Sequence, residues 1–202
     1  MKEDKTVPQL RFPEFTDAWK QRKLKDITNY ENGKGHENNL DNNGTFELIN
    51  LNSVSLDGKL KSSRKFTNEA SDLLNKGDLV MILSDIANGN LLGKVALIPE
   101  DNKYVLNQRV ARLRCVTNTD PKFLSYYINS EKTYFKTHGA GMSQLNISKA
   151  AVENYVLLLP VLEEQKKIGH IFSEIDNTIT LQQRKLESLQ KLKKCLLQQM
   201  FI

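Results

Sequence analysis

The fold is decided by residues 139–202, which read GAGMSQLNISKAAVENYVLLLPVLEEQKKIGHIFSEIDNTITLQQRKLESLQKLKKCLLQQMFI. The character of this stretch changes at Pro160. Before the proline, a glycine-rich turn, a short helix signal and an apolar run are typical of a compact domain. After it, one helical pattern continues with no further proline and with Gly169 as its last glycine. The sequence therefore predicts a globular head that carries a long helical rod.

An apolar seam runs along the predicted rod. Steps that alternate between four and three residues define its positions: Ile168, Phe172, Ile175, Ile179, Gln182, Leu186, Leu189, Lys193, Leu196 and Met200. A mean spacing of about 3.5 residues is that of a coiled coil, and only Gln182 and Lys193 interrupt the apolar character. Gln182 fits either a polar position that fixes the register of a partner helix or a simple local break.

The length of the rod implies a partner. A helix from Glu163 to Met200 is about 57 Å long, at about 1.5 Å per residue. Such a helix cannot bury its own apolar stripe, and the rest of the chain contains no second pattern of that length. We therefore expect a second copy of the chain, or a separate helical subunit, to cover it. The alternative is an amphipathic helix packed on its own domain, although this length exceeds that of ordinary globular helices.

Composition sets broad limits. The 202 residues allow one domain with an appendage, and the net charge of +5 is compatible with a polyanionic partner without being specific for one. The start of the chain is polar rather than apolar, and no apolar run approaches the roughly 18 residues of a membrane span, so we expect a cytoplasmic protein. Cys115 and Cys195 lack a CxxC spacing and are expected to be reduced, buried thiols.

The head reads as a mixed α and β domain. Residues 1 to about 7 are expected to be disordered, and the Asn- and Gly-rich segment Glu31–Gly44 to be a loop. Asp120 and Ser148 are expected to cap two helices. Strands are predicted at residues 45–51, 78–84, 91–98 and 110–116, and helices at 121–130 and 148–155. The expected fold class is α+β, with an N-terminal arm (1–19), a head (20–160) and the long helix (161–202).

Catalytic motifs are not found. The sequence has no phosphate-binding loop, nucleophile elbow, zinc-protease helix or base-gripping tetrapeptide of amino-methyltransferases. Asp85, Asp101 and Lys103 superficially match a Mg²⁺-dependent nuclease, but a charged turn between two strands explains the last two more simply. The three histidines are too scattered to predict a metal site, so no catalytic residue and no bound metal are expected.

Basic and amide side chains recur in the predicted loops of the head. Arginine can bind guanine edges, Asn and Gln can bind adenine edges, and lysine suits phosphates. A solvated surface explains any one of these residues better, and the whole set is as compatible with a surface that contacts DNA as with a solvated face. The candidates for this contact are Lys34, His36, Arg64, Lys65, Lys94, Arg109, Lys136 and Gln144.

An ordered set of segments resembles one known family, the specificity subunits of type I restriction-modification systems. The opening PQLRFPEFTDAWKQRKLKDI is followed by KGDLVMILSD, GNLLGKVALIP and VLNQRVARLR in the middle of the chain. The segments DPKFLSYYINS, GMSQLNIS and LPVLEEQKKI then lead to the ending LKKCLLQQMF. Each segment alone is a weak signal, whereas the order of the whole set is specific and covers nearly the whole chain.

The resemblance implies a non-catalytic reader of double-stranded DNA. A target recognition domain would contact one part of a bipartite site, and long antiparallel helices would set the spacer between the two parts. The helices would also bind methyltransferase subunits, which carry S-adenosylmethionine, and restriction subunits, which use ATP and Mg²⁺, would complete the complex. The chain itself is expected to bind no cofactor.

The chain departs from the family in having one recognition domain and one helical region, where members commonly have two of each. One hypothesis is a half-subunit that pairs antiparallel with a second copy and reads an interrupted palindrome. The seam residues expected at that contact are Ile168, Phe172, Ile175, Ile179, Leu186, Leu189, Leu196 and Met200. The competing hypothesis is a single repeat from a longer subunit. A coiled-coil scaffold with a protein-binding head, or less plausibly a standalone nuclease, is the alternative function.

Overall fold

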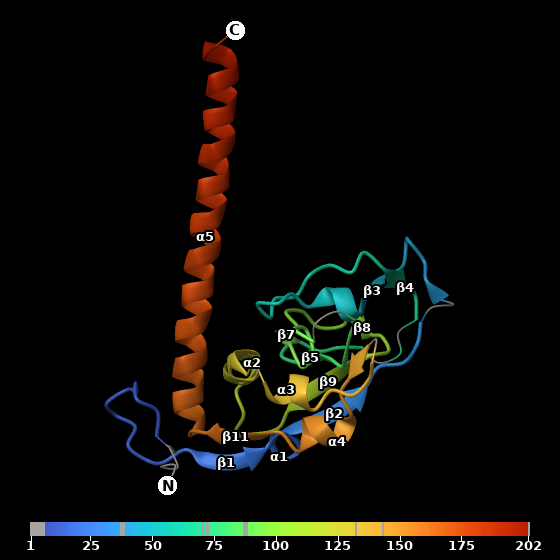
Figure 1. The fold of residues 1–202 in the computed structure, drawn as a ribbon, viewed down its shortest axis with the longest axis vertical. Coiled ribbons are helices and arrows are strands. Elements are labelled where there is room, and N and C mark those ends of the chain that lie inside the picture. Colours follow the sequence, from blue (N-terminus) through green and yellow to red (C-terminus); the bar gives the residue numbers. More distant parts are fainter. Residues whose placement is uncertain are drawn as a thin grey trace.

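The computed structural model describes residues 7–36, 39–69, 71, 73–86, 89–131, 133–142 and 144–201. It consists of a mixed α/β head and one long C-terminal helix, α5, which projects away from the head (Figure 1). The expected fold class is therefore confirmed. The predicted disorder at the N-terminus falls almost entirely on residues 1–6, which lie outside the described residues. No helix in the described ranges is both long enough and apolar enough to cross a membrane.

The centre of the head is a four-stranded antiparallel sheet with the strand order β2–β9–β5–β7. In β5, Leu79 and Met81 belong to one hydrophobic cluster, and Val80 and Ile82 belong to a second cluster. Successive side chains of a strand point to opposite faces, so this sheet is covered on both sides. This explains why β5 is a continuous apolar run. The strands are β2 (Thr28–Asn32), β9 (Val110–Cys115), β5 (Leu79–Ile82) and β7 (Val95–Leu97).

A smaller three-stranded sheet packs beside the first. Its order is β4–β3–β8, with β3 antiparallel to β4 and parallel to β8. Val105 and Leu106 of β8 are fully or almost fully buried, and a short turn leads from this strand directly into β9. The two sheets are therefore joined at the turn between β8 and β9. The strands are β3 (Phe46–Ile49), β4 (Phe66–Thr67) and β8 (Tyr104–Leu106), with the 3₁₀ helix η2 (Leu51–Ser53) following β3.

Both predicted helix caps are present. Helix α2 (Pro121–Ser130) begins with a proline, and the side chain of Asp120 accepts a hydrogen bond from the amide of Phe123 at 2.8 Å. The side chain of Ser148 accepts one from the amide of Ala151 at 3.2 Å and so caps α4. The remaining elements of the head are α1 (Leu24–Ile27), α3 (Tyr134–Thr137), α4 (Lys149–Glu153), β6 (Ser84–Asp85) and β10 (Leu145–Asn146).

The four predicted strand segments contain β3, β5, β7 and β9, so those predictions are confirmed. The sequence did not indicate β1 (Lys20–Lys23), because all four of its residues are polar and exposed. This strand forms because β11 (Val156–Leu159) pairs with it, with Lys20 opposite Leu159 and Lys23 opposite Val156. The predicted loop Glu31–Gly44 also begins too early, since its first two residues belong to β2.

Helix α5 (Leu162–Met200) begins within one residue of the predicted start and, with 39 residues, is about 58 Å long. Its base packs on α2: the rings of Tyr126 and Phe172 lie 5.2 Å apart, and the Tyr126 hydroxyl donates to Asp176 at 2.8 Å. Every residue from Leu181 to Met200 is exposed. Packing on its own domain therefore covers only the base of the helix.

One expectation about the cysteines is wrong. Both are free thiols, but Cys195 lies on the exposed part of α5 and is not buried. Cys115, at the end of β9, is partly buried, and this burial raises the pKa of its thiol to about 12. Only Cys115 therefore behaves as part of the packed interior.

Candidate nucleic-acid interface and partner helix

Several candidate basic residues gather at one end of the two sheets. In the larger sheet, Asn32 of β2 pairs with Ala111 of β9, so the segment after β2 lies beside the start of β9. Lys34 follows and forms an isolated parallel bridge with Asn107, in the turn between β8 and β9. Arg109 is exposed in that same turn. The topology therefore places Lys34 and Arg109 together, although they are far apart in the sequence.

Arg64 and Lys65 reach the same end of the smaller sheet from the other side. The amide of Leu48 in β3 donates to the carbonyl of Lys65 at 2.9 Å, and the amide of Asn107 donates to the carbonyl of Ile49 at 3.0 Å. The segment with Arg64 and Lys65 and the turn that starts at Asn107 thus flank the last residues of β3 on its two sides. Both arginines and Lys65 are exposed.

The loop that carries Arg64 and Lys65 is held by a carboxylate. Oε1 of Glu47 accepts hydrogen bonds from the hydroxyl of Ser62 at 2.6 Å and from the amide of Ser63 at 2.7 Å. The hydroxyl of Ser63 in turn accepts from the amide of Lys65 at 3.1 Å. These bonds order the backbone of an exposed basic segment, so its charges are presented from a fixed position.

Arg64 and Arg109 share an uncommon backbone conformation. Their φ angles are +57° and +66°, in the left-handed region that glycine and asparagine adopt more readily. Two asparagines, Asn102 and Asn118, are the other non-glycine residues with positive φ among those described. Strained backbone positions concentrate at functional sites. The use of arginine at both positions favours a role for the two side chains rather than for the turns.

The other candidates lie in different surroundings. Lys136 is exposed on α3 and lies next to Gly89, in the loop before β7. Gln144 precedes β10, and its amide donates to the side chain of Asn146 at 3.3 Å. Strand β10 pairs with β6, beyond the end of β5, so both residues flank the loop between β6 and β7. They extend the surface with Arg109 and Lys34 instead of forming its centre.

His36 does not fit a surface that contacts DNA. Its ring is 2% exposed, and Nδ1 lies 3.0 Å from Oε2 of Glu69. The hydrogen bond from Asn39, followed by that with His36, holds the pKa of the Glu69 carboxyl below its usual value. His36 therefore anchors the loop after β2 to the segment after β4, and its burial disfavours the predicted direct contact with DNA.

Lys94 also has a structural position. Its Nζ donates to the carbonyl of Asn129 at 2.6 Å, in the last turn of α2, where carbonyls lack helical partners. Cations are favourable at this end of a helix because of the helix dipole. This bond disfavours the predicted contact between Lys94 and a phosphate, which stays a prediction. The roles of Lys34, Arg64, Lys65, Arg109, Lys136 and Gln144 in binding DNA stay predictions.

The structure contradicts a nuclease site. Asp85 follows β5 and is 8% exposed, and its carboxylate accepts from the amide of Leu91 at 3.0 Å. Asp101 follows β7 and accepts from the amide of Lys76 at 2.7 Å. Because β5 and β7 are antiparallel, these two aspartates lie at opposite ends of the hairpin. Among the described residues, no group of three or more His, Cys, Asp or Glu could hold a metal ion.

The base of α5 is fixed by two buried polar residues that the sequence did not single out. Glu164 and Gln165 are both 0% exposed. Gln165 accepts from the amide of Asp120 at 2.8 Å and donates to the carbonyls of Asn118 and Pro160 at 3.2 and 2.9 Å. Glu164 binds Arg11 of the arm. The available signal was their place in the first turn after Pro160, where a carboxylate suits the helix dipole.

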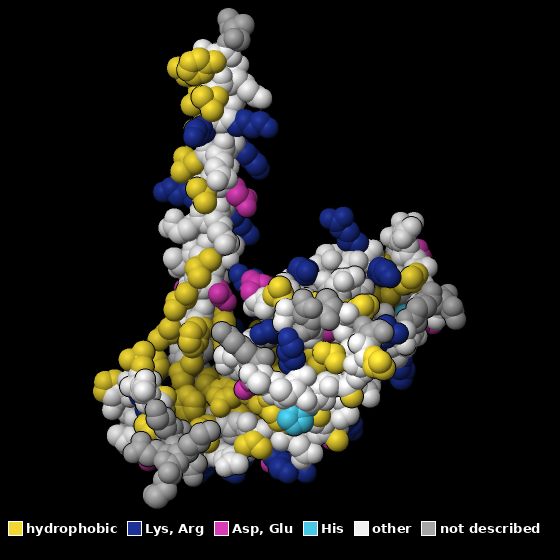
Figure 2. Space-filling view, viewed as in Figure 1, with side chains coloured by type: hydrophobic (Ala, Val, Ile, Leu, Met, Phe, Trp, Pro, Cys, Tyr) yellow, Lys and Arg dark blue, Asp and Glu magenta, His cyan; other side chains and the backbone are white. Residues whose placement is uncertain are grey.

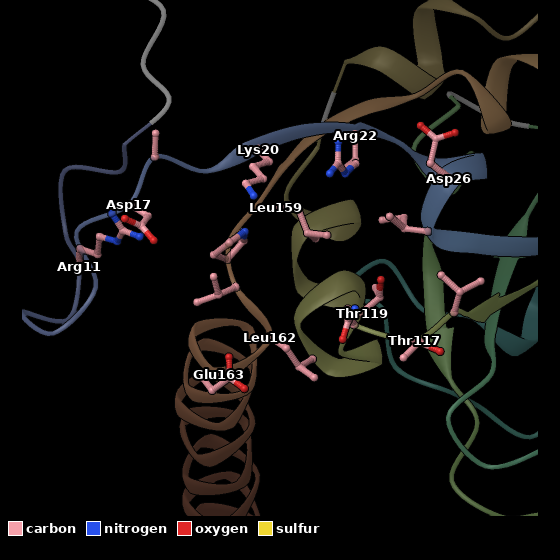
Figure 3. Close-up of a pocket in the computed structure, with 16 residues that line it drawn as sticks. Arg11, Asp17, Lys20, Arg22, Asp26, Thr117, Thr119, Leu159, Leu162 and Glu163 are labelled. Carbon is pink, nitrogen blue, oxygen red and sulfur yellow. The ribbon is translucent and has the colours of Figure 1, made fainter.

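A cavity of about 470 Å³ lies at the junction of the arm, β1, β11 and α5. Figure 3 shows Arg11 and Asp17 on the arm, with Glu163 at the start of α5, and Arg22 and Asp26 on the head side. Acidic and basic side chains are mixed along its walls. This mixture does not favour a site for an anion or for a cation.

The seam of α5 is an exposed apolar stripe. Figure 2 shows hydrophobic side chains along one side of the rod, continuous with an apolar area at its base. Ile179 is 45% exposed, Leu186 56% and Met200 71%, although residues of these types are usually buried. An apolar surface of this length on one protein marks an interaction site. The seam residues exposed in this way are Phe172, Ile175, Ile179, Leu186, Leu189, Leu196 and Met200, whereas Ile168 is partly buried.

The head and rod together match one family. The type I restriction modification DNA specificity domain covers residues 16–191, and the chain belongs to this family. The MjaVIII specificity subunit of Methanocaldococcus jannaschii is 26% identical over 200 residues, and the putative MjaX specificity subunit of the same organism is 28% identical over 201 residues. These matches cover 98% and 93% of this chain.

The fold agrees with a solved member of the family. The specificity subunit from M. genitalium has a TM-score of 0.66 to this structure, with 18% identity over 96% of this chain. The chain spans less than half the length of the relatives it matches: 44% and 46% of the two M. jannaschii proteins and 47% of the M. genitalium subunit. One head and one rod of this chain therefore correspond to about half of those proteins.

Proposed function

We propose that this chain is the DNA-reading subunit of a type I restriction-modification complex and is itself non-catalytic. The observation that carries the proposal is the combination of two surfaces on one chain. The head presents Arg64, Lys65 and Arg109 at one end of its sheets, and the rod exposes an apolar seam. A reader needs the first surface for DNA and the second to place it at a fixed distance from another reader.

The basic surface suits the chemistry of duplex DNA. Exposed arginines at positive φ would read guanine edges or bind phosphates, and Lys34 and Lys65 would neutralise phosphates. Gln144 would bind an adenine edge or a phosphate. Such contacts position the head on the duplex and select its sequence without any bond being broken by this chain.

The charges of α5 favour antiparallel pairing with a second copy. The first part of the helix, residues 162–183, contains four carboxylates and two lysines, whereas residues 184–200 contain five basic residues and one glutamate. Antiparallel copies place the acidic part of one helix beside the basic part of the other. Two heads would then lie at opposite ends of a two-fold symmetric rod, and such a pair reads an interrupted palindrome.

Catalysis would come from partner subunits. A methyltransferase subunit that binds S-adenosylmethionine would extrude an adenine from the duplex, at a cost of a few kcal/mol in lost stacking. A restriction subunit would supply ATP- and Mg²⁺-dependent cleavage. The present chain would give both partners their position on DNA.

The test is adenine methylation in cells that express this chain with a type I methyltransferase subunit, mapped at single-base resolution. We expect methylation at an interrupted palindrome that is absent without this chain. The variant Leu186→Asp, in the exposed seam, should abolish the palindromic pattern, whereas Ser188→Asp, two residues away and off the seam, should not. Methylation of a non-palindromic site, or none despite a stable complex, would instead favour a single repeat that works within a longer subunit.

A further inference from the structure

An apolar cavity lies between the N-terminal arm and the base of α5. It has a volume of about 450 Å³, and apolar side chains form most of its wall. Leu10 stands at its edge and is 92% exposed, which is unusual for a leucine beside a hydrophobic hollow. The apolar residues that line the cavity are Leu10, Phe12, Trp19, Ile168, Ile171 and Phe172.

One polar atom in this wall lacks a partner. Arg11 lines the cavity and binds Glu164 through Nε and Nη2, but its Nη1 is buried and has no hydrogen-bond partner in the described part of the chain. A buried donor without an acceptor is costly. Because Nη1 is shielded from solvent, and so from the cavity, an occupant would be chiefly apolar like the wall.

The far end of α5 has this apolar character. Its last residues are apolar and exposed: Leu196 (45%), Leu197 (49%), Met200 (71%) and Phe201 (71%). The last four carbonyls of a helix have no partners within it, and they carry the negative end of the helix dipole. Among the described residues, the head lies away from this end, because the helix projects away from the head (Figure 1).

The spacing of the seam brings these two surfaces together in an antiparallel pair. The seam is symmetric about Arg184, so two copies that cross at this residue bury the whole stripe at once. Each layer then joins one a position with one d position, as antiparallel coiled coils require. The layers are Ile168 with Met200, Phe172 with Leu196, Ile175 with Lys193, Ile179 with Leu189, and Gln182 with Leu186.

The polar layers are also compatible with this register. Lys193 lies opposite Ile175, whose neighbours Glu174 and Asp176 are acidic, so the ammonium group has carboxylates beside the seam. Gln182 is next to the axis, where a polar residue fixes the register. Any shift by one heptad would leave apolar residues uncovered at both ends.

We propose that the C-terminal end of α5 of a second copy fills the cavity between the arm and the base of α5, and that the exchange is mutual. This inference rests on the proposed antiparallel pairing and adds to it a register and a role for the arm. The arm acts as a clasp: Leu10, Phe12 and Trp19 cover the partner's Met200 and Phe201.

Cross-linking tests the inference in the full chain, with Cys195 replaced by Ser and a bismaleimide reagent. The pair Leu10→Cys and Met200→Cys in one chain should give a covalent dimer in high yield, and neither single variant should. Gln183→Cys, beside the axis, should link to itself across the two copies. Ser188→Cys, which points outward and lies away from the axis, is the matched control and should not link.

A second readout is the dimer dissociation constant, measured by light scattering across a concentration series. Leu10→Ser should raise it at least tenfold without unfolding the monomer, because the side chain is exposed there. Gln9→Ala, at the exposed position beside it, is the matched control and should leave the constant unchanged.

A stable dimer that links through Gln183→Cys, but not between Leu10→Cys and Met200→Cys, would overturn the clasp and leave the pairing intact. A monomer at all concentrations, with no cross-link, would overturn the pairing itself. If only an added methyltransferase subunit protects the thiol of Leu10→Cys from reaction with maleimide, the cavity belongs to that partner. This result would also overturn the clasp.

Discussion

Arg11 and Glu164 join the N-terminal arm to the base of α5 in a bidentate ion pair. Nε and Nη2 of the arginine lie 2.7 and 2.8 Å from the two carboxylate oxygens, across 153 residues of sequence. The side chain of Glu164 is 0% exposed, and that of Arg11 is 11% exposed. The carboxylate also raises the pKa of the Arg11 guanidinium, first through the hydrogen bond. The pair fixes the arm to the first turn of α5, where the proposed clasp is formed.

We expect Arg11→Met to cost more stability than Glu164→Gln. The first change leaves a buried carboxylate without its cation, and we expect a loss of about 2–4 kcal/mol. The second leaves an arginine that can still reach water, with a loss of about 1–2 kcal/mol. Urea denaturation at one fixed protein concentration measures both, since pairing between copies also affects apparent stability.

The double variant Arg11→Met with Glu164→Met completes the cycle for this pair. Its loss of unfolding free energy should be smaller than the sum of the losses in the two single variants, with a coupling free energy of about 1–3 kcal/mol. Additive losses would mean that the two groups do not interact in solution and that the arm is held by its other contacts, such as the ion pair of Glu14 with Lys167 and the packing of Trp19 on Phe123.

Gly169 is a point of close approach between α5 and the start of α2. A Cβ atom at this position would lie 3.0 Å from Oδ1 of Asp120 and from the amide nitrogen of Phe123. In a free helix, alanine in place of glycine stabilises by about 1 kcal/mol, whereas overpacking at a tight contact costs about 1–3 kcal/mol. Gly169→Ala should therefore be neutral to destabilising by thermal unfolding. Ser188→Ala on the exposed rod is the control and should be slightly stabilising; a clear gain for Gly169→Ala would contradict the close approach.

The long helix, the caps at Asp120 and Ser148 and the apolar strands were predictable because each has a local pattern. Strand β1 was not, since Lys-Gln-Arg-Lys becomes a strand only by pairing with β11. The candidate site shows the same division. Exposed Arg64 and Arg109 could be proposed from their loop positions, but the burial of His36 against Glu69 and the bond from Lys94 to α2 depend on distant segments. Long-range contacts of this kind leave no signal in a single sequence.

Alkaline pH should destabilise the head through Cys115 and Tyr30. Burial raises the pKa of Cys115 from 9.0 to about 12 and that of Tyr30 from 10.0 to about 12. Between these values the unfolded chain loses protons that the native chain keeps, so stability falls as pH rises above about 9. The slope contributed by one such group is on the order of 1 kcal/mol per pH unit. Urea midpoints from pH 8 to about 11 measure this. Cys115→Ala should reduce the slope between pH 9 and 10, where the thiol contributes more than any one tyrosine because its ordinary pKa is lower. An unchanged slope there would mean that the thiol is accessible to solvent.

Arg64 and Arg109 allow folding and DNA binding to be separated. Glycine adopts a positive φ without steric cost, so Arg64→Gly and Arg109→Gly should leave stability within about 1 kcal/mol of the parent chain. If these side chains contact DNA, each change should still weaken binding to the DNA site that the mapping of adenine methylation identifies. A base contact would cost about 1–3 kcal/mol and relax the sequence preference at one position. A phosphate contact would weaken binding evenly across sequences. It would also reduce the slope of log binding constant against log salt concentration by about one.

Lys65→Ala is the companion variant, and we expect the phosphate pattern for it: weaker binding to all sequences and a flatter salt dependence. Lys25→Ala is the matched control, because Lys25 lies on α1, which precedes β2 and so occupies the opposite end of the sheet. Fluorescence anisotropy with the specific duplex and a scrambled duplex, over a series of salt concentrations, distinguishes these outcomes. A change in site preference with Lys65→Ala would move this lysine from phosphate contact to base reading. Equal effects of Lys65→Ala and Lys25→Ala would show that the binding depends on net charge alone, and the proposed surface at the end of the sheets would then be wrong.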